Sequence, residues 1–214
     1  MEFAAHRAFE AGGRGLALSG TRRRGPRIRR KYLQPRIWIP AGIGIGVLAA
    51  AEPTPLSLLF GLPLVAAGVA LRTWACGHLT KTDELAVSGP YAHVRHPLYL
   101  GTLLIVTGFL LAASHEVASA ALAGFLAVFF GRYLPRKERS EAMRLAQRHG
   151  EAFEAWREAV PPLWPRLRPW KAPPELGLAA SRWEWRRYQE NHEAGTLLVV
   201  VAALLLLWMR PLGG

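Results

Sequence analysis

Five long stretches of this sequence contain no charged residue, and they constrain the fold more than any other feature. They run over residues 37–51, 56–71, 98–113, 117–131 and 194–209. Each is somewhat shorter than the ~20 residues that cross a bilayer as a helix, but flanking Trp, Tyr and Arg side chains can extend each by a turn. None has the polar stripe of a soluble amphipathic helix. The pattern predicts an all-α integral membrane bundle with about five transmembrane helices.

The basic residues between these stretches predict an orientation. The chain carries 27 Lys and Arg against 15 Asp and Glu, a net charge of +12. With five spans, every basic residue except Arg210 falls on one side, which the positive-inside rule makes cytoplasmic. We therefore expect a multi-pass protein of the cell (inner) membrane with a cytoplasmic N-terminus and an external C-terminus. Anionic lipid head groups explain this charge more simply than nucleic acid, so no nucleic-acid partner is expected.

The sequence divides into three predicted regions. Residues 1–36 form a basic cytoplasmic tail, either a topology determinant or an anionic-lipid anchor. A core over 37–169 would contain spans near 37–51, 55–72, 97–113 and 117–134 and a cytoplasmic helix over 136–159, bent at Gly150. Residues 170–214 would add an amphipathic helix and a last span, as an accessory to the core. The oligomeric state stays open.

Polar and ring-bearing residues are dense between the second and third spans. Gly89-Pro90 indicates a turn, and Pro97 suits the first turn of a helix, whose free amides can bind an anionic group. Arg95 and His96 precede that helix. The spacing predicts a pocket at the membrane surface for a partly anionic, partly aromatic ligand, unless Arg95 and His96 only reach lipid phosphates. The single cysteine and the spacing of His, Asp and Glu indicate no metal site.

Two segments resemble the signatures of a known superfamily. Gly89-Pro90-Tyr91 followed by Arg95-His96-Pro97-Leu98-Tyr99-Leu100-Gly101 is similar to a GPYxxxRHPxYxG pattern, and 141–161 is similar to EExxLxxxxGxxYxxYxxxVP. Ala142, Phe153 and Trp156 depart from the second pattern. The two patterns are the signatures of the isoprenylcysteine carboxyl methyltransferase and phospholipid methyltransferase superfamily of integral membrane enzymes. The resemblance covers about residues 55–165.

The resemblance implies S-adenosylmethionine-dependent methyl transfer to a lipophilic or small acceptor at the cytoplasmic face. On the same basis Arg95 and Glu141 would be catalytic. The residues expected to bind S-adenosylmethionine are Tyr91, His96, Pro97, Tyr99, Gly101 and Glu141, where Gly101 would let the ligand approach the backbone. The alternatives are an NADPH-dependent membrane reductase of related fold and a catalytically inactive membrane binding or scaffold protein.

Overall fold

The computed structural model of this chain describes residues 35–79, 84–191 and 193–213. Most of the predicted basic tail, residues 1–34, lies outside them. The chain divides into two units, Met1–Trp38 and Ile39–Gly214, and the second contains nearly all of the described residues. These residues form helices and connecting segments without a strand, so the all-α prediction is confirmed. The elements are α1 (Pro35–Ala49), α2 (Pro55–His78), η2 (Gly89–Ala92), α3 (Pro97–Ala113), α4 (Glu116–Val128), η3 (Phe129–Tyr133), α5 (Leu134–Ala159), η4 (Pro174–Leu176), α6 (Trp185–Glu190) and α7 (Glu193–Trp208).

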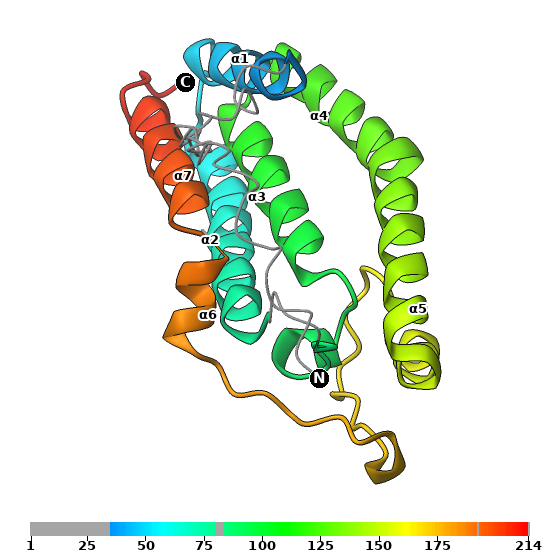
Figure 1. Cartoon of the computed structure of the whole chain (residues 1–214). Helices are drawn as coiled ribbons and strands as arrows, with labels where there is room; N and C mark the ends of the chain where they lie inside the picture. Colours follow the sequence, from blue (N-terminus) through cyan, green and yellow to red (C-terminus); the bar gives the residue numbers. More distant parts are fainter. Residues whose placement is uncertain (1–34, 80–83, 192, 214) are drawn as a thin grey trace, which may run out of the picture. The chain divides into compact units, whose positions relative to one another are not determined.

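Helices α2 and α3 lie side by side in the centre of the second unit (Figure 1). Glycines allow the close approach. A Cβ atom on Gly61 would come within 2.5 Å of the Gly108 carbonyl oxygen, and one on Gly68 within 2.6 Å of the Gly101 oxygen. Small residues that let two backbones touch are typical of helix pairs in membranes, where packing replaces the hydrophobic effect. The two helices therefore form the rigid base from which the loop between them projects.

Helices α4 and α5 form one continuous rod through a π-helical turn over Phe129–Tyr133. The α4 part of the rod contacts α3, and the polar helix α5 continues the rod away from the apolar α4 (Figure 1). Gly150 breaks the helical geometry with φ of 50° and ψ of −123°, so the bend predicted there is confirmed. A positive φ suits glycine because it has no Cβ. The last turns of α5 thereby fold back toward the α2–α3 loop.

The last helix, α7, returns along α2 (Figure 1). An apolar core joins α1, α2, α3, α4 and α7; its buried members include Val47, Val65, Ile105, Phe109, Ala118 and Val200. Asn191 ends α6 and donates hydrogen bonds from its side-chain amide to the carbonyls of Cys76 (3.0 Å) and Leu79 (2.9 Å) at the end of α2. The region after residue 170 is thus packed into the bundle rather than appended to it.

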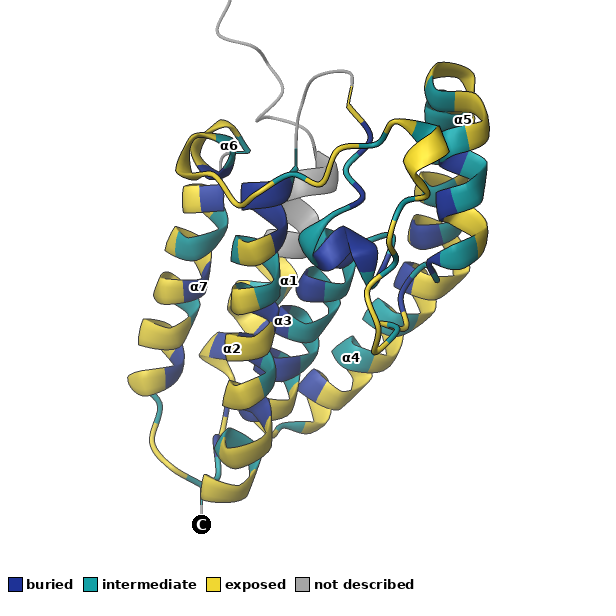
Figure 2. Ribbon diagram, turned by 90° about the horizontal axis from the view of Figure 1, so that it is seen from below, coloured by how far each residue is buried: buried dark blue, intermediate teal, exposed yellow. Residues whose placement is uncertain are grey.

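Apolar side chains cover the outward faces of the long helices. Exposed residues run along α2, α4 and α7 (Figure 2), and Leu198 on α7 is 71% exposed. An apolar surface this extensive is unsuited to water and fits lipid. In the described part of the chain, two helices are long and apolar enough to cross a membrane, Pro55–His78 and the rod Glu116–Ala159, while Pro97–Ala113 and Glu193–Trp208 are shorter apolar helices. The structure thus indicates membrane association, and the five-span bundle is not established.

Candidate ligand-binding pocket

The loop that enters α3 is held in place by the segment that follows α5. Gly89 has a φ of 59°, and a Cβ atom there would come within 2.4 Å of the His78 ring, so glycine is required on both counts. Four backbone hydrogen bonds of 2.8–3.1 Å then join residues 92–96 to 161–170. They are Arg95 N to Pro161 O, His96 N to Pro162 O, Arg166 N to His93 O and Trp170 N to Ala92 O. These bonds fix the backbone from which the first site residues project.

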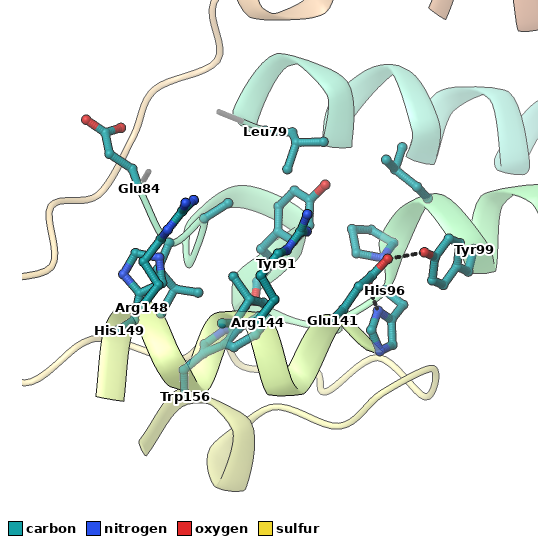
Figure 3. Close-up of a pocket in the computed structure, with 15 residues that line it drawn as sticks. Leu79, Glu84, Tyr91, His96, Tyr99, Glu141, Arg144, Arg148, His149 and Trp156 are labelled. Atoms are coloured by element: carbon teal, nitrogen blue, oxygen red, sulfur yellow. Dashed lines mark hydrogen bonds and ion pairs between the residues drawn. The ribbon is translucent and has the colours of Figure 1, made fainter. Parts of the chain in front are cut away.

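A cavity of about 360 Å³ lies between this loop and α5 (Figure 3). Its wall contains acidic, basic and aromatic side chains together with an apolar floor. The lining residues are Leu79, Glu84, Leu85, Ala86, Tyr91, His96, Pro97, Leu98, Tyr99, Glu141, Arg144, Leu145, Arg148, His149 and Trp156. Such a mixture suits a small molecule that has an apolar part and charged groups of both signs.

Three of the predicted site residues meet at one end of the cavity (Figure 3). The Tyr99 hydroxyl donates a hydrogen bond to Glu141 Oε1, and His96 Nδ1 lies 3.6 Å from Glu141 Oε2. The rings of His96 and Tyr99 stack with centroids 5.3 Å apart. The carboxylate of Glu141 is therefore oriented by a hydroxyl on α3 and faces an imidazole at the start of the same helix.

Burial governs the charge state of His96. Desolvation is the largest influence and lowers the pKa of His96 below its ordinary value, although the Glu141 carboxylate acts in the opposite direction. Its Nε2 atom is buried and has no hydrogen-bond partner among the residues that the structure describes. Burial likewise raises the pKa of the Tyr91 hydroxyl, so Tyr91 is a neutral phenol. Burial thus favours the uncharged forms of the His96 and Tyr91 rings.

The two arginines that line the cavity were missed in the sequence. Arg144 and Arg148 line the cavity from α5, where they share a face with Glu141 and His149 (Figure 3). Positions 141, 144, 145, 148 and 149 follow the i, i+3, i+4, i+7, i+8 spacing of one helical face. That spacing is visible in the sequence and is the signal that could have found them. Glu84, from the other wall, lies in the polar stretch between the second and third spans but was not among the expected site residues.

The remaining predicted site residues lie elsewhere. Arg95 does not line the cavity: its guanidinium pairs with Glu138 Oε1 at 2.9 Å. Gly101 faces α2, since a Cβ atom there would come within 2.4 Å of Arg72 Cγ and 2.9 Å of the Gly68 oxygen. The structure thus brings Tyr91, His96, Pro97, Tyr99 and Glu141 together at the cavity, whereas the missing side chain of Gly101 serves helix packing.

The residues that depart from the second motif belong to the core beneath the cavity. Phe153 and Trp156 are buried in a cluster with Tyr91 and Val160, and Ala142 packs against that cluster. The Trp156 indole donates a hydrogen bond to the Tyr91 carbonyl at 3.0 Å. A second glutamate at position 142 would have to place its carboxylate against this apolar cluster. The rings of Phe153 and Trp156, which lack the hydroxyl of tyrosine, suit this buried apolar cluster.

Two curated proteins are similar to this chain. One is the cobalt-zinc-cadmium resistance protein CzcN of Cupriavidus metallidurans, 34% identical over 116 residues, which are 53% of this chain and 51% of that protein. The other is the nickel-cobalt-cadmium resistance protein NccN of Alcaligenes xylosoxydans xylosoxydans, 35% identical over 98 residues, 45% of this chain and 44% of that protein. The chain spans about half the length of the curated relatives it matches. No family model and no solved structure match it.

These comparisons correct the assignment that the two motifs suggested. The relatives are named as metal-resistance proteins and not as methyltransferases, and no family model places the chain in the isoprenylcysteine carboxyl methyltransferase superfamily. The identification with that superfamily, the methyl-transfer function and the description as a methyltransferase are therefore overturned. Neither the reductase nor the inactive scaffold is what the relatives' names describe.

A metal ion could be held only by suitable side chains that converge. Among the residues that the structure describes, no three His, Cys, Asp or Glu side chains are grouped so that they could hold a metal ion. Tight transition-metal sites usually need three or four such ligands. The cavity wall itself carries charged and aromatic side chains.

Proposed function

We propose that this chain is a helical membrane protein that contributes to resistance against divalent transition-metal cations. The observation that carries the proposal is its similarity to two proteins named for such resistance in two organisms. We propose further that it acts through the cavity between α3 and α5 rather than by holding the metal ion. This second part is supported by the described part of the chain, where no three His, Cys, Asp or Glu side chains are grouped so that they could hold a metal ion.

The cavity wall supports a small zwitterionic ligand. Glu141 offers a carboxylate to a cationic group, while Arg144 and Arg148 offer guanidinium groups to a carboxylate or phosphate. The Tyr91 and Tyr99 rings lie in the same wall and suit a cation or an aromatic group. S-adenosylmethionine is one molecule of this class and stays a prediction for the cavity, with no methyl transfer attached to it.

The finer topology belongs to this proposal as well. We place the protein as a multi-pass protein of the cell (inner) membrane with a cytoplasmic N-terminus and the cavity at the cytoplasmic face. The uneven distribution of Lys and Arg between the apolar stretches and the lipid-suited outer surface support this placement. Anionic head groups at that face are the expected lipid partners.

A metal-tolerance assay tests the proposal. Cells that lack the gene would be complemented with the full chain and challenged with cobalt, nickel, zinc or cadmium. We expect the parent chain to raise the tolerated concentration of at least one cation. Glu141→Gln, which removes the charge from the cavity, should lose most of that gain, whereas Glu154→Gln on an exposed part of α5 should keep it. Growth equal to that of cells without the gene would refute the function.

A second measurement separates the two parts of the proposal. Equilibrium dialysis of the purified full chain against each cation should show no stoichiometric, tightly bound metal. One tightly bound ion per chain, together with intact resistance, would show that the protein acts as a metal binder and would refute the role of the cavity.

A further inference from the structure

The segment between α5 and η4 carries two large apolar side chains that the protein leaves exposed. Leu167 is 97% exposed and Trp164 is 82% exposed. Both lie on an irregular segment, where no lipid-facing helix explains their exposure. Large apolar side chains that are this exposed mark a surface that something covers.

The backbone of this segment cannot turn those side chains inward. Arg166 donates a backbone hydrogen bond to the His93 carbonyl at 3.0 Å, and its carbonyl lies 2.8 Å from His93 Nδ1. The Arg166 guanidinium also donates to the Ala159 carbonyl at 2.8 Å. Pro165 restricts the residue before it. Arg166 is therefore held in place by these hydrogen bonds, and the exposed Trp164 and Leu167 lie on either side of it in the sequence.

The segment reaches into the apolar zone of the bundle. Leu163 is buried in a cluster with Phe129 and Leu134. Tyr133 contacts Tyr99 at the cavity, with ring centroids 5.6 Å apart, and Phe129 lies one helical turn, about 6 Å, further along the rod toward α4. Trp164 follows Leu163 directly, so it lies near the level of Phe129, where the polar helix α5 gives way to the apolar helix α4.

The charge of the segment favours a negative partner. Arg166, Arg168 and Lys171 lie within it, Arg168 and Lys171 are exposed, and no acidic residue occurs between 159 and 174. Beside it is a recess of about 240 Å³ with a mainly apolar lining, formed by Leu71, Trp74, Pro90, His93, Val94 and Pro165. An apolar recess next to exposed cations matches the two parts of an anionic phospholipid.

We propose that residues 164–171 insert into the surface of the bilayer and bind an anionic phospholipid. Trp164 and Leu167 enter the boundary between head groups and acyl chains, where tryptophan is enriched. An acyl chain lies against the recess, and the phosphate lies beside Arg168 and Lys171. This inference rests on the proposed membrane location and adds to it a lipid site on residues 164–171, whose recess shares no lining residue with the cavity.

Nitroxide accessibility tests the insertion. The full chain carrying Cys76→Ala would be labelled at Leu167→Cys and reconstituted into vesicles of phosphatidylcholine and phosphatidylglycerol. We expect this label to collide more with oxygen than with a water-soluble nickel chelate. Leu198→Cys on the outer face of α7 is the lipid-side control, and Glu151→Cys, exposed on α5, is the water-side control.

The controls separate failure of this inference from failure of the proposed membrane location. If position 167 behaves like 151 while 198 remains in lipid, the insertion is refuted and the membrane protein stands. If 198 also meets the nickel chelate, the proposed membrane location fails together with the inference.

A second experiment tests the choice of lipid. A fluorophore on Leu167→Cys would be quenched by a nitroxide-labelled phosphatidylglycerol or phosphatidylcholine at equal mole fraction. Each Lys or Arg near the membrane surface is attracted to anionic lipid. We therefore expect phosphatidylglycerol to quench the fluorophore about twofold more strongly than phosphatidylcholine, or more. Arg168→Gln with Lys171→Gln should abolish that preference, and Arg136→Gln with Arg139→Gln on α5 should keep it. Equal quenching by both lipids in the parent would refute the anionic site.

Discussion

Arg72 and Glu193 form a two-point ion pair although they lie 121 residues apart in the sequence. Arg72 Nε lies 2.7 Å from Glu193 Oε1, and Nη2 lies 2.7 Å from Oε2. Nη1 of the same guanidinium donates to Thr102 Oγ1 at 2.7 Å and to the Leu98 carbonyl at 3.1 Å. One partly buried cation therefore connects α2, α3 and α7 at the end of the bundle that carries the cavity.

Removing the acid of this pair should destabilise the protein strongly. Glu193 is only 3% exposed, so Glu193→Ala would leave the Arg72 charge largely buried without its partner. Breaking such a pair costs on the order of 3–5 kcal/mol, and we expect the free energy of unfolding to fall by about that amount. Circular dichroism during denaturation in detergent micelles would measure it.

A surface pair on α6 provides the matched control. Glu190 pairs with Arg186 at 2.9 Å, with the arginine largely exposed, so Glu190→Ala should cost less than about 1 kcal/mol. The double variant Arg72→Leu with Glu193→Leu should be less destabilised than Glu193→Ala, because no charge stays buried. Equal losses for Glu193→Ala and Glu190→Ala would show that the buried pair does not hold α7.

Two helical glycines should respond oppositely to alanine. A Cβ atom on Gly108 would come within 2.6 Å of the Gly61 oxygen and 2.8 Å of Val65 Cγ2, whereas Gly124 on α4 has nothing within 4 Å. Gly108→Ala forces α2 and α3 apart and should cost about 1–3 kcal/mol. Gly124→Ala should be neutral or stabilising by up to about 1 kcal/mol, because it removes backbone freedom from the unfolded chain. Thermal unfolding of both variants measures these changes in stability. An equal change in the two variants would contradict the close contact between α2 and α3.

The buried His96 should make stability depend on pH. Burial lowers its pKa in the folded protein below the ordinary 6.5. Between the two values the unfolded chain binds a proton that the folded chain does not, so stability falls as the pH drops through 6.5. The loss levels off below the pKa of the folded state. Denaturation of the parent and of His96→Asn from about pH 7 to about pH 5 should show a shallower decline in the variant.

Glu141 controls the size of that effect. Its carboxylate raises the pKa of His96 against the influence of burial, so Glu141→Gln should lower the pKa further and steepen the decline. The pKa of His96 can be followed by NMR of protein with labelled histidine. A His96 pKa that is unchanged in Glu141→Gln would contradict the arrangement of these two residues.

Reporter fusions should place the two sides of α7 in different compartments. Lys and Arg are frequent before this helix, and only Arg210 follows it. The positive-inside rule then puts a reporter inserted after Leu176 in the cytoplasm and one fused after Gly214 outside. A cytoplasmic reporter at both positions would remove α7 from the set of spans.

Local features were accessible from the sequence because they depend on near neighbours. The uncharged stretches gave the helices, Pro97 stands at the first turn of α3, and Gly150 marks the bend in α5. The grouping of His96, Tyr99 and Glu141 at one cavity agrees with the two motifs that suggested it. The methyl-transfer function predicted from those motifs was wrong, because the similar proteins are named for metal resistance. A motif that builds a pocket does not by itself define the function of that pocket.

The sequence by itself determined that the chain is helical, where its apolar stretches lie, and that Tyr91, His96, Pro97, Tyr99 and Glu141 belong to one site. Only the tertiary structure decided that Gly101 packs against α2, that Arg95 pairs with Glu138, and that Glu193 binds Arg72. The physical reason is the range of the interactions. Helix periodicity and capping involve residues within a few positions of each other, whereas these three contacts depend on how whole helices cross and on which partner can neutralise a charge removed from water.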